Sequence, residues 1–162
     1  MVKEIVFMKP INQETISWLI EHCGQEKEIN ILLNSSGGDA SAAISFYNFI
    51  AYQGISLMVT VIGCCDSAAL MILCAAKKRR AYRNTTLLLH HLRRCYSIER
   101  NFRVNDLKDE AADLRVFESR LENIISITTG KSVKELKKHI DREKSLTAAQ
   151  AYKLGLLTVR PL

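Results

Sequence analysis

Residues 57–63, LMVTVIG, form an almost wholly apolar run that is rich in β-branched side chains and has the length of a strand. A strand without polar alternation is buried on both faces, which favours a parallel sheet covered by helices. Two other runs of strand length precede it, EIVFM at residues 4–8 and INILL at residues 29–33. Apolar residues at helical spacing separate the three runs, so residues 4–63 predict a β-α-β-α-β arrangement.

Capping residues indicate where the intervening helices begin and end. Asn12 can cap the start of the first helix. Gly54 follows the second helix, at a position where a residue in the left-handed conformation is favoured. An apolar helix over residues 68–76 is expected next. Two short strands, around residues 81–82 and 87–90, should follow it.

The second half of the chain predicts one long helix and two short ones. Residues 98–128 contain neither Gly nor Pro and keep one stripe apolar, which predicts a long helix, at least in its second half, ended by Gly130. S-x-x-E at residues 132–135 and T-x-x-Q at residues 147–150 have capping-box spacing, so each predicts the start of a short helix. A last strand is expected at residues 156–159.

Composition indicates one globular domain over residues 1–162. The chain is 48% hydrophobic and 25% charged, which is enough for a real core. No apolar run has the length needed to span a bilayer, and no signal-peptide pattern opens the chain. We therefore expect a cytoplasmic protein without a membrane partner.

The charged clusters and the cysteines predict no nucleic-acid or metal site. The net charge of +6 comes partly from KKRR at residues 77–80 and RR at residues 93–94, which lack interleaved aromatic residues and are expected to be solvated surface. The five cysteines are odd in number and form no CxxC pair, so they are expected to be small buried residues.

A serine follows the most apolar run, in the segment GCCDSAAL at residues 63–70. At the carboxyl end of a buried strand and the start of a helix, the Ser67 hydroxyl lies where a helix dipole stabilises negative charge. Ser67 can therefore be a nucleophile, or simply an N-cap. His90 ends another apolar strand, so it is either the base for Ser67 at the same sheet edge or a surface residue.

Five motifs, in one order along the whole chain, resemble those of the ClpP family, the proteolytic subunits of the Clp protease. LNSSGG at residues 33–38 resembles the family's INSPGG, GCCDSAAL at 63–70 resembles GxAASMGA, and RNTTLLLH at 83–90 resembles PNSxxMIH. TTGKS at 128–132 and SLTAAQAYKLGLLT at 145–158 resemble HTGQS and FLSAxEAxxYGLVD. The resemblance implies the α/β ClpP/crotonase-like fold of repeated β-α-β units, with a long handle helix and short C-terminal helices.

The resemblance also implies a serine endopeptidase that cleaves small or unfolded polypeptides through an acyl-enzyme. Carried over by position, Ser67 is the nucleophile and His90 the general base. The oxyanion donors are the backbone N–H groups of Gly38 and Ala68. Gly37 and Gly38 additionally leave a backbone edge with which an extended substrate can pair.

Three acidic residues complete the expected site. Glu143 falls on the position of the third catalytic residue that the resemblance implies, and Asp141 is the fallback. Asp141 and Arg142 are also expected as a charged pair that holds ring to ring in the assembly. Asp66 departs from the small residue of the family's pattern, and it could deter anionic substrates, act on His90 electrostatically or cap the following helix.

The resemblance implies two stacked heptameric rings that enclose the active sites, with residues 93–125 as the handle between rings. No cofactor is implied for this chain, and ATP enters only through a partner AAA+ unfoldase. Family members contact this ATPase through a segment before the first strand, whereas this chain begins almost on that strand, so an ATPase-independent peptidase or a subunit of a mixed complex is also open. A catalytically impaired assembly or regulatory subunit and crotonase-type acyl-CoA chemistry are the alternative functions.

Overall fold

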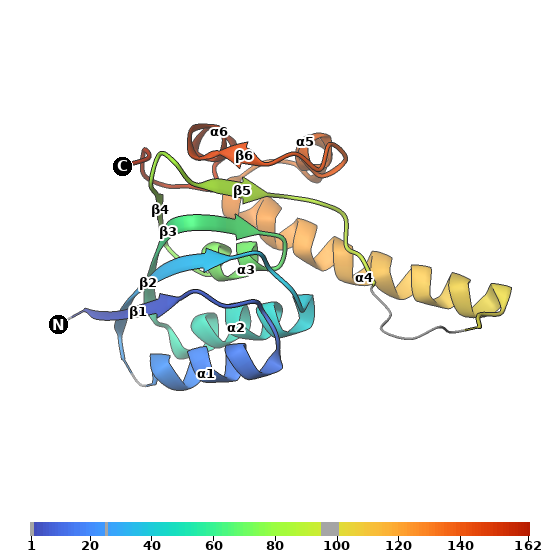
Figure 1. Cartoon of the computed structure of the whole chain (residues 1–162), viewed down its shortest axis with the longest axis horizontal. Helices are drawn as coiled ribbons and strands as arrows, with labels where there is room; N and C mark the ends of the chain where they lie inside the picture. The colour runs from blue at the N-terminus through green and yellow to red at the C-terminus, as the bar shows by residue number, and fades with distance from the viewer. Residues whose placement is uncertain (1, 25, 95–100) are drawn as a thin grey trace.

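The computed structural model describes residues 2–24, 26–94 and 101–162. Its elements are, in chain order, β1 (Lys3–Phe7), α1 (Gln13–Cys23), β2 (Glu28–Ser35), α2 (Ala40–Gln53), β3 (Ser56–Asp66), α3 (Ala69–Cys74), β4 (Lys78–Ala81), β5 (Thr86–Leu88), α4 (Val104–Thr129), α5 (Val133–Ile140), β6 (Leu146–Thr147) and α6 (Ala148–Leu154). Figure 1 shows the strands stacked into one sheet, with α4 reaching well beyond it. The α/β fold class expected from the sequence is confirmed.

Strand β3 lies at the centre of the sheet. It pairs in parallel with β2 along one edge, and along the other edge with β4 at residues 58–61 and then with β5 at residues 64–66. Strand β1 pairs in parallel with β2, and β6 pairs antiparallel with β5. The predicted β-α-β-α-β arrangement of the first three strands is therefore confirmed.

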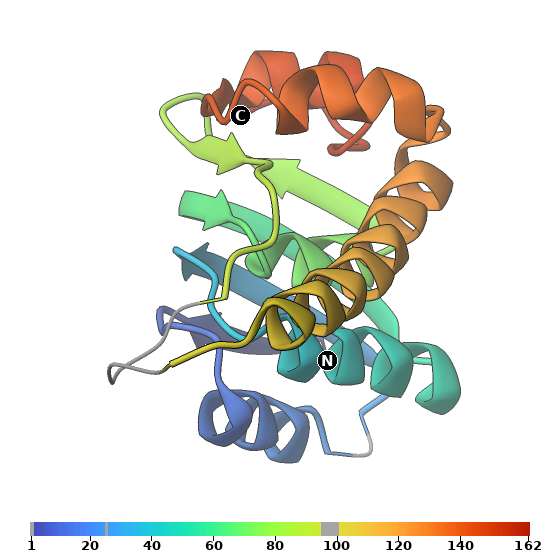
Figure 2. The ribbon, with the colours of Figure 1, turned by 90° about the vertical axis from the view of Figure 1, so that its right-hand side faces the viewer.

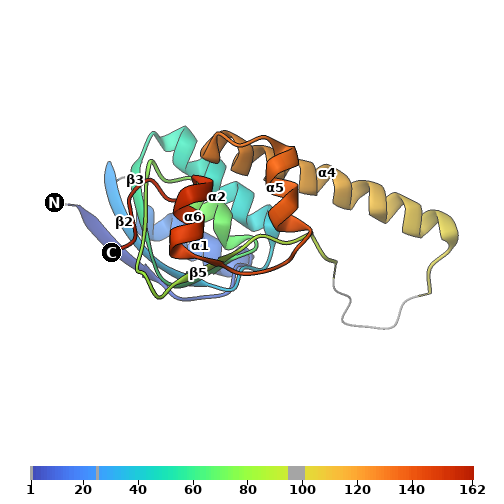
Figure 3. The same ribbon diagram turned by 90° about the horizontal axis from the view of Figure 1, so that it is seen from above.

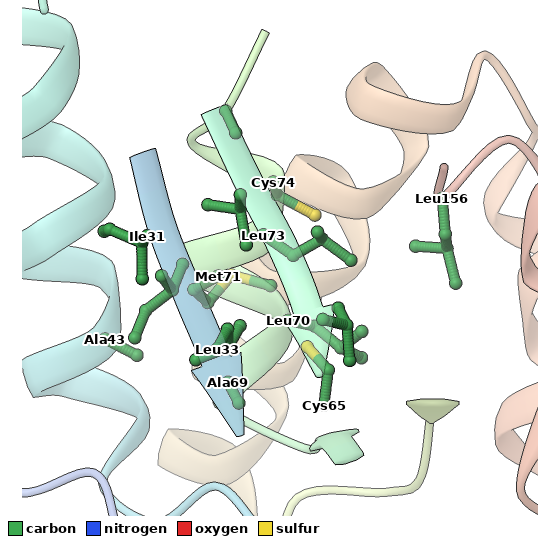
Figure 4. Close-up of a cluster of buried hydrophobic side chains, with 14 of the residues drawn as sticks. Ile31, Leu33, Ala43, Cys65, Ala69, Leu70, Met71, Leu73, Cys74 and Leu156 are labelled. Carbon is green, nitrogen blue, oxygen red and sulfur yellow. The ribbon is translucent and has the colours of Figure 1, made fainter. Parts of the chain in front are cut away.

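The core lies on one face of this sheet, where α3 packs. All six residues of α3 are buried, and Figure 4 shows Met71 of this helix in one cluster with Ile31 and Leu33 of β2. The prediction that the sheet is buried on both faces is wrong. On the opposite face, Val6 of β1 is 51% exposed and Met58 of β3 is half-buried. The alternation of buried and half-buried residues along β2 follows from this one-sided cover.

Helix α4 is the long helix predicted from the apolar stripe. Its 26 residues give a length of about 39 Å, and Figure 3 shows its first turns projecting away from the sheet. Only Glu122 and Ile125 are buried along it. The helix begins at Val104, and residues 95–100 of the expected handle lie outside the described residues.

The capping signals are confirmed. The side chains of Asn12, Ser132 and Thr147 each accept a hydrogen bond from a backbone N–H in the first turn of the helix that follows, and Gly54 and Gly130 adopt the left-handed conformation at the ends of α2 and α4. Figure 2 shows the two short C-terminal helices lying together at the end of the sheet beside β5. Side chains therefore determine where these helices begin.

The strand predicted at residues 156–159 is wrong. After α6 the chain follows β4 through separated hydrogen bonds, with Thr158 N–H donating to Arg79 O at 2.9 Å and Leu162 N–H donating to Ala81 O at 3.0 Å. These bonds do not form a continuous ladder, so no strand results. The antiparallel pairing at β6 was not expected from the sequence.

Arg79 corrects the interpretation of the first basic cluster as solvated surface. Its guanidinium is half-buried and donates to the carbonyl oxygens of Ala76, Thr128, Gly155 and Leu156 at 2.8–3.3 Å. The carbonyl of Ala76 follows α3, that of Thr128 lies in the last turn of α4, and those of Gly155 and Leu156 follow α6. Arg79 therefore joins three helix ends, whose last carbonyls lack partners within their own helices.

Cys23, Cys65 and Cys74 are buried as expected, Cys64 is half-buried, and all four are free thiols. Cys95 lies outside the described residues. Within the described ranges, no helix combines the length and the apolar character needed to cross a membrane. The same part of the chain contains no group of three His, Cys, Asp or Glu residues that could hold a metal ion.

A matched pair of truncations tests where the core lies. Ile31 of β2 is fully buried, whereas Ile127 of α4 is 78% exposed. We expect Ile31→Ala to lower the free energy of unfolding by about 2–5 kcal/mol, because it removes transfer energy and leaves a cavity. Ile127→Ala should change it by less than about 0.5 kcal/mol. Urea denaturation measures both values, and equal losses would contradict this description of the core.

Candidate active site

Ser67 stands at the turn between β3 and α3 in a strained backbone conformation. Its φ is 58°, in the left-handed region that residues other than glycine rarely adopt. Its N–H donates to Leu88 O of β5 at 2.9 Å, which holds the turn against the neighbouring strand. A sharp strand-to-helix turn of this kind exposes the hydroxyl of a nucleophilic serine.

The alternative interpretation of Ser67 as an N-cap is wrong. The N-cap of α3 is Ala68, and no side chain caps this helix. Among the described residues, the Ser67 hydroxyl has no hydrogen-bond partner. The same observation makes the capping hypothesis for Asp66 wrong, because Asp66 is the last residue of β3.

The two glycines let the 36–39 turn approach Ser67 closely. A Cβ at Gly37 would lie 2.7 Å from Ser67 Cβ and 3.0 Å from Ala68 N, and one at Gly38 would lie 2.1 Å from Ile11 O. No larger residue fits either position without moving the backbone. The N–H groups of Gly38 and Ala68 have no acceptor within the described part of the chain, so both are free to donate to a ligand.

One edge of the glycine turn is already paired and the other is open. Ile11 N–H donates to Gly37 O and Asp39 N–H donates to Ile11 O, both at 2.8 Å. Because successive peptide groups of an extended chain alternate in direction, the N–H of Gly38 faces away from Ile11. The edge predicted for pairing with an extended peptide is thus the one that carries this free donor.

His90 lies two residues beyond the end of β5 and lines the same pocket as Ser67. Its Nδ1 is 2.5 Å from the carbonyl oxygen of His91. Because a carbonyl oxygen only accepts, Nδ1 carries the proton and Nε2 is the basic nitrogen. No hydrogen bond joins Ser67 and His90 in the described structure, although both residues reach one cavity.

The two carboxylates expected to orient His90 have other partners. Glu143 forms an ion pair with Arg93, and Asp141 Oδ1 lies 3.0 Å from Nε2 of His91. The structure therefore brings Ser67 and His90 together but does not bring Glu143 or Asp141 onto His90. Their catalytic role stays a prediction.

Asp66 is a third carboxylate near the histidine. Burial raises the pKa of Asp66, while a hydrogen bond from Cys64 and the charge of His90 oppose this rise. Its Oδ1 is buried without a hydrogen-bond partner among the described residues. Asp66 is thus a half-buried, incompletely satisfied carboxylate that interacts electrostatically with the candidate base.

The cavity that contains Ser67 and His90 is called here the Ser67 pocket. Its lining residues are Ala40, Ser67, Ala68, Leu70, Met71, Leu89, His90, Leu92, Glu118, Leu121, Glu122, Ile125 and Ile140. Most of this lining is apolar, and two carboxylates of α4 interrupt it. The sequence contains a signal for these two carboxylates. Leu114, Glu118 and Glu122 follow one another at intervals of four residues, so they are neighbours on one side of the helix, within its apolar stripe.

His91 joins the loop after β5 to two helices. Its Nδ1 lies 2.8 Å from Glu118 Oε1 of α4, and its Nε2 contacts Asp141 at the end of α5. The hydrogen bond with Glu118 is the largest contribution that raises the pKa of His91 above its usual 6.5. The side chain is 46% exposed, as expected for a residue beside the strand-end histidine.

The sign of this linkage can be tested by pH titration of stability. Because folding raises the pKa of His91, its protonation stabilises the folded chain below pH 6.5, and that contribution is lost as the pH rises through the raised value. The free energy of unfolding should therefore fall more steeply above pH 6.5 in the natural chain than in Glu118→Gln, which removes the main partner. If the free energy of unfolding, measured by denaturation at each pH, depends on pH identically in the two proteins, the pairing of His91 with Glu118 is contradicted.

Two comparisons with known proteins assign this chain to a family. A sequence model of the Clp protease family matches residues 2–159. The chain is also 30% identical over 133 residues to the ATP-dependent Clp protease proteolytic subunit 4 of Rhodococcus jostii (strain RHA1), an alignment that covers 81% of this chain and 66% of that protein. This chain thus spans just under two thirds of the relative's length. Since the family match extends over nearly all of the sequence, the chain belongs to the Clp protease family.

Proposed function

We propose that this chain is a serine-type endopeptidase that hydrolyses small or unfolded polypeptides, with Ser67 as nucleophile and His90 as general base. The observation that carries the proposal is the conformation of Ser67. Its φ of 58° is energetically costly and has no role in helix capping. Its hydroxyl has no partner among the described residues and lies in the same pocket as His90. Family membership supports the same chemistry.

The reaction follows from the positions of the donors and acceptors. Ser67 Oγ attacks the scissile carbonyl carbon while His90 Nε2 takes the hydroxyl proton. The free N–H groups of Gly38 and Ala68 are the proposed donors to the oxyanion, and losing one such donor typically costs about 100-fold to 1000-fold in rate. His90 then protonates the leaving amine, and water hydrolyses the acyl-enzyme by the reverse sequence.

The partner of His90 Nδ1 affects the expected rate. The His91 carbonyl selects the productive tautomer but carries no full negative charge to stabilise the imidazolium that forms. We propose Glu143 as the source of that charge, with Asp141 as the alternative. Either role requires a change of partner in the assembled particle, from Arg93 or from His91 respectively.

We further propose that the chain assembles with copies of itself into rings that enclose these sites. Val104 and Leu107 in the first turn of α4 and Val116 further along it are each at least 50% exposed, which supports a helix that packs against other subunits. Arg142 is exposed and has no ion-pair partner within the described ranges, which supports the pairing between rings expected for Asp141 and Arg142. An AAA+ unfoldase is a possible further partner.

Covalent labelling tests the nucleophile. A fluorophosphonate should label the assembled chain at Ser67, and Ser67→Ala should abolish the label, because only an activated serine reacts. His90→Ala should reduce the labelling rate by at least about 100-fold, since it removes the base. Ser36→Ala, in the exposed glycine turn, is the matched control and should label normally. Intact-mass spectrometry that finds no adduct on the folded, assembled chain would overturn the proposed activity.

A second test addresses assembly. Arg142→Ala should shift the particle toward smaller species in sedimentation velocity, because it removes the cation proposed to pair between rings. Lys134→Ala removes another exposed cation, on α5, and should leave the distribution unchanged. The same distribution in all three proteins would contradict the role of Arg142.

One observation favours a second candidate function, a catalytically silent assembly or regulatory subunit. Within the described residues, no carboxylate hydrogen-bonds to His90, so the hydrogen-bonded carboxylate that normally stabilises the imidazolium is missing. This candidate predicts ring assembly together with absent fluorophosphonate labelling. The endopeptidase predicts both assembly and labelling, so the two experiments above distinguish them.

A further inference from the structure

We propose that the Ser67 pocket selects a basic side chain, lysine or arginine, at the substrate residue whose carbonyl Ser67 attacks, with Glu122 as the residue that determines this specificity. The inference rests on the proposed endopeptidase function and deepens it by naming the substrate class. It depends on a buried carboxylate that lies in the same cavity as the nucleophile and has no role in the reaction itself.

Glu122 is the first observation. Its residue exposure is 7%, although it belongs to a helix whose other buried residue is apolar. Its Oε1 is buried and has no hydrogen-bond partner among the described residues, although it forms a long ion pair with Lys137 Nζ at 3.7 Å. A buried carboxylate oxygen without a hydrogen bond is expensive, so the pocket lacks a donor that a ligand can supply.

The composition of the pocket is the second observation. Leu70, Met71, Leu121 and Ile125 line it together with Glu118 and Glu122. Lysine and arginine have an apolar stem and a charged end, so they match an apolar wall that ends at carboxylates. A norleucine or leucine side chain would pack against the same apolar wall but would leave Glu122 Oε1 without a hydrogen-bond donor. Sites built to hydrogen-bond a substrate group discriminate strongly against analogues that lack it.

Each of these carboxylates has an ion-pair partner at the rim of the pocket, His91 for Glu118 and Lys137 for Glu122. Glu118 accepts hydrogen bonds from His91 Nδ1 and from the N–H of Leu92, so it is already satisfied. The side chains of His91 and Lys137 are 46% and 51% exposed, and their charges are therefore screened by water more strongly than those inside the cavity. Burial raises the pKa of Glu122, and the charge of Lys137 opposes this rise. A substrate cation in the cavity would add to the effect of Lys137 and stabilise the ionised form.

The experiment compares three peptides that differ only at the residue before the scissile bond, which is lysine, norleucine or glutamate. Norleucine keeps the stem of lysine without the ammonium group. With the full chain in its assembled form, we expect kcat/KM for the lysine peptide to exceed that for the norleucine peptide by at least about 10-fold, and the glutamate peptide to be the poorest.

Glu122→Gln should lower the lysine-to-norleucine ratio by about 10-fold to 100-fold while kcat/KM for norleucine changes by less than about 3-fold. That second value shows that the variant is folded and keeps its catalytic groups. Asp113→Asn removes one negative charge from the exposed part of α4 outside the pocket, and it should keep the natural ratio.

A natural chain that cleaves norleucine as well as lysine, or a ratio that Glu122→Gln leaves unchanged, overturns the inference while the endopeptidase function stands. Fluorophosphonate labelling at Ser67 without cleavage of any of the three peptides also overturns the inference alone. The absence of both labelling and cleavage overturns the proposed function and the inference with it.

Discussion

The site depends on the way strand β3 changes partners along one edge. Strand β4 pairs with its first half and β5 with its last three residues, so β5 lies beside the carboxyl end of β3. The hydrogen bond from Ser67 N–H to Leu88 O then connects the turn to β5. Because His90 follows β5 by two residues, this pairing places it in the cavity of Ser67. A single central strand thus fixes the relative positions of Ser67 and His90.

The parts of the fold that the sequence predicted have strong local causes. A fully apolar run such as residues 57–63 favours burial wherever it lies, and a capping side chain such as Ser132 or Thr147 acts within three residues. Ser67 and His90 were predictable as neighbours because each ends an apolar strand of a parallel sheet. The strand at residues 156–159 failed because its bonds to β4 are separated, which the local sequence does not reveal.

The partners of charged side chains could not be predicted in the same way. Glu143 contacts Arg93 and Asp141 contacts His91, pairs that are both 50 residues apart in the sequence. An exposed ion pair contributes only about 0–1 kcal/mol, so several arrangements of long side chains have similar energies. Arg79 shows the opposite extreme, since its partners are carbonyl groups at three helix ends that no local pattern identifies. Tertiary packing decides these contacts.

Several costly features lie around one cavity. Ser67 has a strained φ, Asp66 Oδ1 and Glu122 Oε1 are buried without hydrogen bonds among the described residues, and Gly37 packs against the Ser67 turn. The strained backbone and each unsatisfied oxygen cost about 1–3 kcal/mol, which an ordinary backbone and satisfied side chains would avoid. They persist because the paired strand β3 and the buried helix α3 hold the surrounding backbone in place. The strain at Ser67 therefore supports the proposed chemistry of the cavity.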